Sequence, residues 1–401
     1  MTSIRFDGAF AIEEAAGRVA LAGRVVVEAP VVFQPAIVLG LSGPGGEVSA
    51  HSGETHYVGW LPRGTYRVRC FLPGTVAAGD WRMRLDLFHK AAMADERAAT
   101  LEGAFALPAP AAAPGTPAAW SFEALPPGVA IENLSWKRGH ANWFFRHFDH
   151  AAATVQSYML GDSPLLRGRI LDVGCGDGIT ALSLALRTGC EELVGVDPFR
   201  GYEKLPQILA ENHLPADTVP SRVHFRPDDA NELGFEDDRF DVVVSWGSLE
   251  HIVGGYARAL REIRRVLRPG GLFFVHPGLF YSTIGSHLTE FSSEPFFHLK
   301  HSREELERLV LGTRPAYMDR AGTFEPPENY WRWFTELNPI TVAGFEKELR
   351  DLGFEPWRVA LRTEDRIEYT PELQRYPIQD LATNELYLSC HNRKPGAGNP
   401  R

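Results

Sequence analysis

The chain has 401 residues, and with 44% hydrophobic and 11% aromatic residues it can bury more than one core. Its net charge of −10 argues against a nucleic-acid partner, because such proteins usually carry a basic patch. The cysteines have no paired spacing, which excludes a disulfide framework and favours a reducing compartment. No apolar run reaches membrane-spanning length, so we expect a cytoplasmic protein without membrane insertion.

The first 105 residues alternate apolar and polar positions. In "GTYRVRCFL" (64–72) arginines separate apolar residues, and "GDWRMRLDL" (79–87) repeats the pattern. Such alternation in short segments bounded by Gly and Pro is typical of half-buried antiparallel strands. We therefore expect residues 1–105 to form a small antiparallel β-sandwich.

A change of composition separates this part from the rest. Residues 106–120, "ALPAPAAAPGTPAAW", are rich in Ala and Pro and predict a semi-rigid linker. From residue 168 onward, apolar runs alternate with amphipathic helical segments, which is the pattern of a mostly parallel sheet covered on both faces. We expect this second, α/β domain to occupy residues 121–395.

The first apolar run of this domain leads into "LDVGCGDG" (171–178). Its three glycines let the backbone turn tightly and approach a ligand where a Cβ would clash. The next strand ends at Asp197, about twenty residues further on, where a carboxylate can accept hydrogen bonds from ribose hydroxyls. Ile179 stands where a dinucleotide fingerprint needs glycine, so the spacing favours an adenosine ligand without a pyrophosphate.

Four ordered blocks resemble the class I S-adenosylmethionine-dependent methyltransferases, over about residues 140–395. They are "LDVGCGDG", "VGVDP" (194–198), "RPDDANELGFEDDRFDVVVSWGSLEHI" (226–252) and "REIRRVLRPGGLFFV" (261–275). The resemblance implies a Rossmann-like fold and S-adenosylmethionine as the cofactor.

The same resemblance implies which residues surround the cofactor. Asp172 would hold the loop or contact the methionine ammonium, Asp197 would bind the ribose, and Asp229 with Ala230 the adenine; Asp228 is an equal candidate. Trp246 would border the sulfonium and stabilise it through its π face, or fill the core. The implied set is Asp172, Gly174, Cys175, Gly176, Gly178, Asp197, Pro198, Asp228, Asp229, Ala230, Trp246 and Gly247.

Methylation of a hydroxyl requires that the acceptor lose a proton, so histidines beyond the strand ends are candidate bases. His287 lies in "VHPGLFYSTIGSHLTEF" (275–291), after the predicted fifth strand, and we predict that it is the catalytic base. His251 in "SLEHI" is a second catalytic candidate. Related methyltransferases often carry Glu-His at this position, so Glu250 and His251 also fit a structural or cofactor-adjacent role.

The segment 277–340 is longer than the fold requires, and the resemblance implies that it forms the acceptor pocket. We predict substrate contacts there from Tyr281, Ser282, His298, His301, Tyr330 and Trp331. The aromatic rings would equally suit the core of a lid. His298 and His301, with Asp228 or Asp229, have spacing that permits a metal, as in some sugar O-methyltransferases, but no carboxylate motif requires one and we predict no metal site.

The alternating strands of "PRGTYRVRCFLPGTVAAGDWRMRLDLF" (62–88) are similar to the glycan-binding β-sandwich of O-antigen ABC transporters. This resemblance suggests an enzyme of polysaccharide biosynthesis that O-methylates a sugar hydroxyl in a glycan or glycolipid precursor. A domain for homo-oligomerisation or stability is the alternative reading of residues 1–105. For the whole chain, the alternatives are a natural-product O- or N-methyltransferase and a non-catalytic glycan-binding scaffold.

Overall fold

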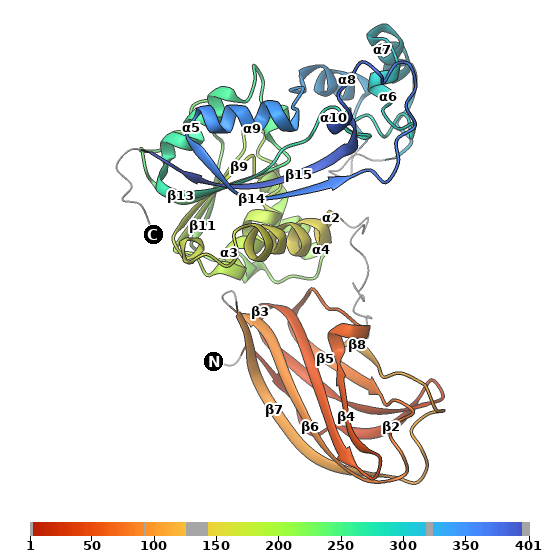
Figure 1. Cartoon of the computed structure of the whole chain (residues 1–401). Helices are drawn as coiled ribbons and strands as arrows, with labels where there is room; N and C mark the ends of the chain where they lie inside the picture. Colours follow the sequence, from red (N-terminus) through yellow and green to blue (C-terminus); the bar gives the residue numbers. More distant parts are fainter. Residues whose placement is uncertain (1–2, 92–93, 126–142, 318–323, 395–401) are drawn as a thin grey trace. The chain divides into compact units, whose positions relative to one another are not determined.

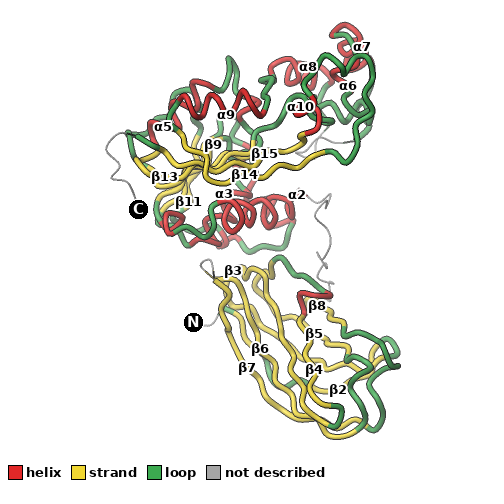
Figure 2. The backbone as a smooth tube through the Cα atoms, viewed as in Figure 1, coloured by secondary structure: helices red, strands yellow, loops and turns green. Residues whose placement is uncertain are grey.

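A computed structural model describes residues 3–91, 94–125, 143–317 and 324–394, and it divides into two compact units (Figures 1 and 2). One unit comprises Met1–His150 with Pro206–Pro220, and the other Ala151–Leu205 with Ser221–Arg401. Residues 126–142, which belong to the expected second domain, and residues 318–323 of the predicted insertion lie outside the described residues. Each unit encloses its own hydrophobic core.

The first unit is built from antiparallel strands. They are β1 (Ile4–Phe6), β2 (Ala11–Ala15), β3 (Arg18–Gly43), β4 (Gly46–His51), β5 (Trp60–Phe71), β6 (Gly79–Ala91), β7 (Ala94–Leu107) and β8 (Ala119–Leu125), with the short helix α1 (Ser52–Thr55). The long β3 joins two layers. Its first half pairs with β1, β2 and β5, whereas its second half pairs with β4 and β6. Apolar side chains from both halves line one core, which agrees with the predicted sandwich.

The predicted linker is wrong in its extent and in its role. β7 continues to Leu107, and β8 pairs with β5 from Phe71–Ala119 to Thr65–Leu125. Trp120 and Phe122 of β8 are buried in the core of the first unit. Residues 108–118 therefore connect two strands of one domain, because the Pro-rich stretch ends where the alternation "AWSFEAL" resumes.

The second unit has a seven-stranded sheet in the order β11-β10-β9-β12-β13-β15-β14. The strands are β9 (Arg169–Val173), β10 (Glu192–Val196), β11 (Val223–Arg226), β12 (Phe240–Trp246), β13 (Leu267–His276), β14 (Phe354–Thr363) and β15 (Thr383–Asn392). The first five strands of the order are parallel, whereas β15 is antiparallel to both β13 and β14. The expected Rossmann-like, mostly parallel sheet is confirmed. Its strand order reverses between β9 and β12, where such sheets bind ligands beyond their carboxyl ends.

Helices cover both faces of this sheet, with α3 on one side and α5 and α9 on the other (Figure 1). The α-helices are α2 (Trp143–Phe145), α3 (Ile179–Thr188), α4 (Leu205–Glu211), α5 (Ala257–Val266), α6 (Phe297–Lys300), α7 (Arg303–Gly312), α8 (Pro327–Glu336), α9 (Val342–Asp351) and α10 (Ile378–Ala382). Helical segments of π or 3-10 type are η1 (Arg146–Ala151), η2 (Thr154–Met159), η3 (Pro164–Arg167), η4 (Gly201–Lys204), η5 (Ala216–Thr218) and η6 (Leu249–His251). Sheet strands such as β9 are buried on both faces and therefore read as continuous apolar runs.

The segment after β13 contains α6, α7 and α8, and it has small cores of its own. One of them joins Leu288, Val310 and Tyr330. A second joins Phe296 and Leu299 to Leu373 and Leu381, which belong to the connection between β14 and β15. Two segments that are far apart in the sequence, the one after β13 and the connection between β14 and β15, thus pack together. We call these two segments the lid region.

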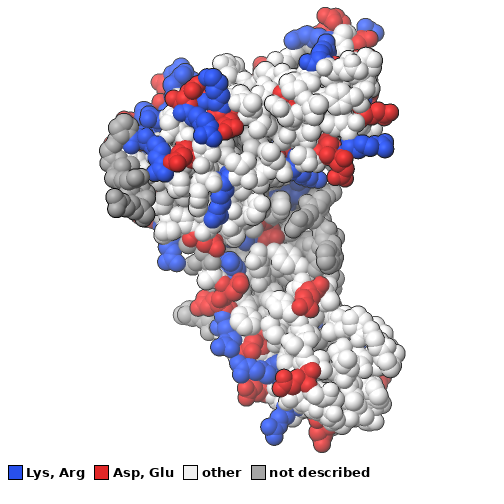
Figure 3. Space-filling model, viewed as in Figure 1, with Lys and Arg blue, Asp and Glu red and all other residues white. Residues whose placement is uncertain are grey.

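The helices of the described residues are all too short or too polar to cross a lipid bilayer. On the face drawn in Figure 3, acidic and basic side chains of the described residues are interspersed.

Candidate active site

The glycine loop follows β9 and is packed against the segment that follows β12. Gly174, Gly176 and Gly178 all have positive φ, between 55° and 79°. A Cβ on Gly174 would lie 2.3 Å from the Cβ of Ser248, whose hydroxyl donates to the carbonyl of Val173 at 3.1 Å. The loop therefore needs glycine both for its backbone conformation and for this close approach.

Asp197, at the end of β10, organises the same loop. Its carboxylate accepts from the backbone N–H of Gly176 (3.1 Å) and of Phe199 (2.8 Å). The next two residues, Pro198 and Phe199, are exposed, and the Phe199 ring is 85% accessible. Our sequence reasoning missed Phe199. An aromatic residue two positions after the acidic strand end, in "VDPF" (196–199), is the sequence signal that points to it.

Asp172 lies on β9, within the sheet. Burial raises the pKa of its carboxyl group to about 7, and the nearby charges of Asp197 and Asp177 add to the effect. Burial likewise raises the pKa of the Cys175 thiol, so this side chain is a neutral thiol at pH 7. The strand that leads into the glycine loop thus carries a carboxyl group whose pKa is raised to about 7.

The structure separates the roles of the two neighbouring carboxylates after β11. Asp228 pairs with Arg226 at 2.5 Å and accepts from the N–H of Gly234 at 3.1 Å, so it holds the turn that follows. Asp229 is exposed, while Ala230 packs against the core. Of the pair, Asp229 has the accessible side chain.

Trp246, the last residue of β12, belongs to an aromatic group at the end of the sheet. Its ring centroid lies 4.7 Å from that of His276, and His276 stacks on Tyr387 at 4.4 Å with the planes 7° apart. The Nδ1–H of His276 donates to the carbonyl of Leu386 at 2.9 Å. Tyr387 comes from β15, more than 100 residues after His276, and no local pattern in the sequence indicates that it joins this group.

The two histidines predicted as catalytic candidates lie side by side. The ring centroids of His251 and His287 are 4.9 Å apart, and the carboxylate of Glu250 reaches within 3.8 Å of His251 Nε2. One donor atom from each of these three residues lies within 4.8 Å of the other two. Glu250 and His251 form the turn η6 beyond β12, and His287 comes from the segment beyond β13. Two strand ends thus bring together groups that the sequence separates by 36 positions.

His298 and His301, which were predicted to contact the substrate, do not join the cluster of Glu250, His251 and His287. His298 is buried, its Nε2–H donates to the carbonyl of Phe280 at 2.5 Å, and burial lowers its pKa to about 4. His301 instead pairs with Glu294 at 3.0 Å. Among the described residues these two histidines do not form a metal-ligand group with Asp228 or Asp229, so that option is wrong. His298 lies in the short helix α6, whereas His301 follows its end, and the two side chains have different partners.

Other predicted substrate contacts fill cores. Tyr330 is 2% exposed and packs on Phe291 and Trp333, which favours the alternative of a lid core. Ser282 is also buried. Tyr281 is half-buried beside Tyr376, and Trp331 is half-buried. Most of these side chains pack against other residues of the insertion and its neighbours.

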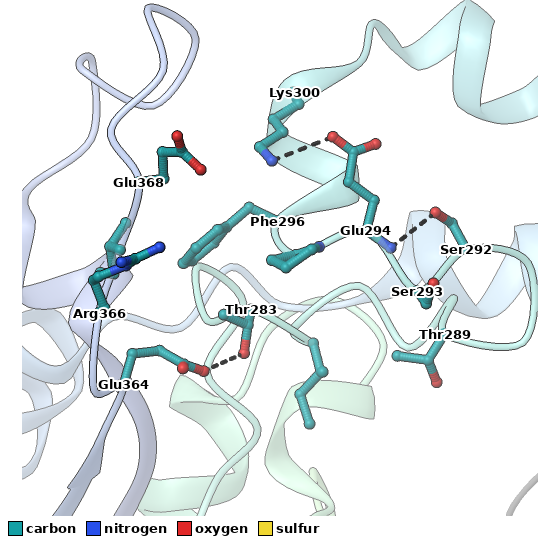
Figure 4. A pocket seen from close by; sticks show the side chains of 13 residues that line it. Thr283, Thr289, Ser292, Ser293, Glu294, Phe296, Lys300, Glu364, Arg366 and Glu368 are labelled. Atoms are coloured by element: carbon teal, nitrogen blue, oxygen red, sulfur yellow. Dashed lines mark hydrogen bonds and ion pairs between the residues drawn. The ribbon is translucent and has the colours of Figure 1, made fainter.

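A polar pocket of about 450 Å³ lies between the two parts of the lid region (Figure 4). On one side it is lined by Thr283, Phe296 and Lys300, and on the other by residues of the segment 364–368, including Arg366. The hydroxyl of Thr283 donates to Glu364 at 2.8 Å across the pocket. None of Glu250, His251 and His287 lines it.

Comparison with known proteins identifies the family of the chain. The family described as "Methyltransferase domain" matches residues 171–275. A ubiquinone biosynthesis O-methyltransferase of Azorhizobium caulinodans is 37% identical over 230 residues, which are 55% of this chain and 74% of that protein. A 27-O-demethylrifamycin SV methyltransferase of Amycolatopsis mediterranei is 36% identical over 124 residues, 31% of this chain and 43% of that protein. Among solved structures, a geranyl diphosphate methyltransferase aligns with a TM-score of 0.38 and 15% identity over 61% of this chain and 77% of that one.

The chain therefore belongs to the class I S-adenosylmethionine-dependent methyltransferases, and its cofactor is S-adenosylmethionine. Within this class, the chain belongs with the S-adenosylmethionine-dependent O-methyltransferases.

Proposed function

We propose that this protein transfers the methyl group of S-adenosylmethionine to a hydroxyl oxygen, and that the acceptor is bound beside Glu250, His251 and His287. The observation that carries the proposal is the position of this cluster. Its turn, η6, directly follows Ser248, which contacts the glycine loop. A group that accepts a proton thereby lies next to the methyl donor's loop.

The reaction needs only alignment and removal of one proton. The acceptor oxygen forms the new O–CH₃ bond while the S–CH₃ bond breaks, and the sulfur keeps the electron pair as a neutral thioether. The hydroxyl proton passes to the cluster, with His287 as the proposed base and His251 beside it. On the cofactor side, Asp197 would bind the ribose and Asp229 the adenine, and Phe199 would stack on the purine ring.

A sugar hydroxyl is our proposed acceptor. The polar pocket, which the cluster does not line, would hold sugar units away from the reacting hydroxyl, and Glu364, Arg366 and Glu368 on one wall offer them charged hydrogen-bonding groups (Figure 4). The second candidate is a small aromatic or polyketide hydroxyl. It is favoured by two of the relatives, a ubiquinone biosynthesis O-methyltransferase and a 27-O-demethylrifamycin SV methyltransferase.

A matched pair of glycine variants tests the cofactor assignment. Gly176 and Gly189 both have positive φ, and a Cβ on either would meet nothing within 4 Å, so Gly→Ala costs a similar backbone strain of about 1 kcal/mol at each. We expect Gly176→Ala to lose S-adenosylmethionine binding by calorimetry, because its methyl would enter the cofactor's place. Gly189→Ala, at the end of α3, should bind as the wild type does. Equal binding by both variants would sink the assignment, and absence of binding by the wild type would favour a non-catalytic scaffold.

The acceptor is tested by release of S-adenosylhomocysteine with two panels, one of oligosaccharides and one of phenolic or polyketide alcohols. We expect turnover with a saccharide, and Arg366→Gln should raise its KM about tenfold with little change in kcat, because this side chain would contact only bound sugar. Turnover confined to the phenolic panel would replace the sugar assignment by the second candidate.

A further inference from the structure

We propose that Glu250, His251 and His287 bind a divalent transition-metal ion. The three side chains offer one carboxylate oxygen and two imidazole nitrogens, and these donor atoms lie within 4.8 Å of one another. Bonds of about 2.1 Å converging on one ion place donors roughly 3.4 Å apart, so small side-chain rotations would close the site.

A second observation at the cluster is a buried carboxylate oxygen without a hydrogen-bond partner. The Glu250 side chain is 4% exposed, and its Oε2 is buried without a hydrogen-bond partner. A buried carboxylate oxygen without a partner is costly, and a cation would satisfy it. The space for this carboxylate comes from Gly278, where a Cβ would lie 2.6 Å from Glu250 Oε1.

The backbone holds the ligands in position from two sides. The backbone N–H of Asn338 donates to the carbonyl of Glu250 at 2.8 Å. The side-chain amide of Asn338 donates to the carbonyls of Leu249 (2.8 Å) and Ile252 (3.0 Å). These three hydrogen bonds fix the turn that carries Glu250 and His251. His287 has a φ of 54°, a left-handed conformation that is strained for a residue with a side chain. Hydrogen bonds that fix a ligand-bearing segment, like those of Asn338, are common around metal ligands.

The ligand set and its exposure indicate which ion fits. Two imidazoles with one carboxylate favour manganese, iron, cobalt or zinc over magnesium or calcium, which prefer all-oxygen sites. The His251 side chain is 41% exposed, so the cluster is open on one side. Three protein ligands then leave a coordination position for water or an acceptor hydroxyl.

The use of the ion in catalysis rests on the proposed function, whereas its binding does not. A hydroxyl oxygen bound to a divalent ion loses its proton more readily, so the metal would take over the task otherwise assigned to a lone histidine base. The proton would leave to solvent through the open side, and the oxygen would attack the methyl group as described above.

The test uses the full-length protein, stripped of metal with a chelator and titrated with Co²⁺ and Mn²⁺. We expect one ion per chain by calorimetry and a visible Co²⁺ spectrum with nitrogen ligands. Glu250→Gln and His287→Gln should each weaken binding by at least about tenfold. The control, His224→Gln, changes an exposed histidine on β11 and should leave binding unchanged. S-adenosylmethionine binding by every variant reports that the unit is folded.

The outcomes separate the two proposals. Binding that is equal in the wild type, Glu250→Gln and His287→Gln would assign the ion to adventitious surface groups and overturn the site. A wild type that binds S-adenosylmethionine but no transition metal would overturn the site and leave the proposed function standing. A wild type that binds the metal but no S-adenosylmethionine would support the site and defeat the proposed function. Magnesium that competes at equal concentration would overturn the choice of a transition metal.

Discussion

Asp172 shows how one buried side chain couples the glycine loop to pH. It is 3% exposed, and burial is the largest cause of its raised pKa. Because the folded-state pKa of about 7 lies above the ordinary aspartate value of 3.8, folding favours the protonated form. The stability that this group contributes is present below about pH 4 and is lost as the pH rises towards 7.

Asp172→Asn should therefore make the free energy of unfolding depend less on pH between pH 4 and 8. The shift of about three units corresponds to a loss on the order of 4 kcal/mol in the wild type between pH 4 and 8. We expect the variant to be the more stable protein at pH 8 without cofactor, and near equal to the wild type at pH 4. Urea denaturation of the isolated protein at both pH values measures the difference.

Glu262 provides a control of the opposite sign. Its hydrogen bond with Arg265 lowers the pKa of the Glu262 carboxyl, so its contribution is present at neutral pH and is lost in acid. Glu262→Gln should consequently reduce stability at pH 8 more than at pH 4. A decline of equal size in the wild type and in Asp172→Asn would show that Asp172 is not its source.

At the scale of elements, β8 completes the sheet of the first unit. It supplies the sheet edge beside β5, and its Trp120 and Phe122 fill the core. A fragment of residues 1–105 would leave that edge unpaired and remove both rings. We expect a fragment of residues 1–125 to unfold cooperatively in circular dichroism, and the shorter one to aggregate or unfold without a transition.

The composition of residues 106–120 explains why a linker between domains was predicted where the structure has a loop followed by β8. Pro and Ala predict the absence of regular structure correctly for residues 108–118, but they do not tell whether the flanking strands share a sheet. Cooperative unfolding of both fragments with equal midpoints would show that β8 adds nothing to the domain.

For the whole molecule, two cores imply two units that unfold as separate cooperative bodies. S-adenosylmethionine should stabilise only the unit that carries the glycine loop, by about 2.7 kcal/mol at a concentration of 100 times Kd. We expect two calorimetric transitions, of which the cofactor raises one. A single transition that moves as a whole would contradict the independence of the units.

The sequence by itself determined the fold of the second unit and the glycine loop that follows β9. Apolar runs such as "RILDV" and "FDVVVS" are readable because both faces of their strands are buried, and the glycines of "LDVGCGDG" are required by local backbone geometry. It also singled out His251 and His287 one at a time.

Only the tertiary structure decided which of these residues meet. Glu250 and His251 come from one strand end and His287 from another, and their proximity depends on the pairing of β12 with β13 and on the room left by Gly278. The same holds for Tyr387 beside His276, and for His298, which was predicted to contact substrate and is buried instead. Sequence patterns record the period and burial of single elements, whereas contacts across the sheet depend on strand order and register, which no local pattern encodes.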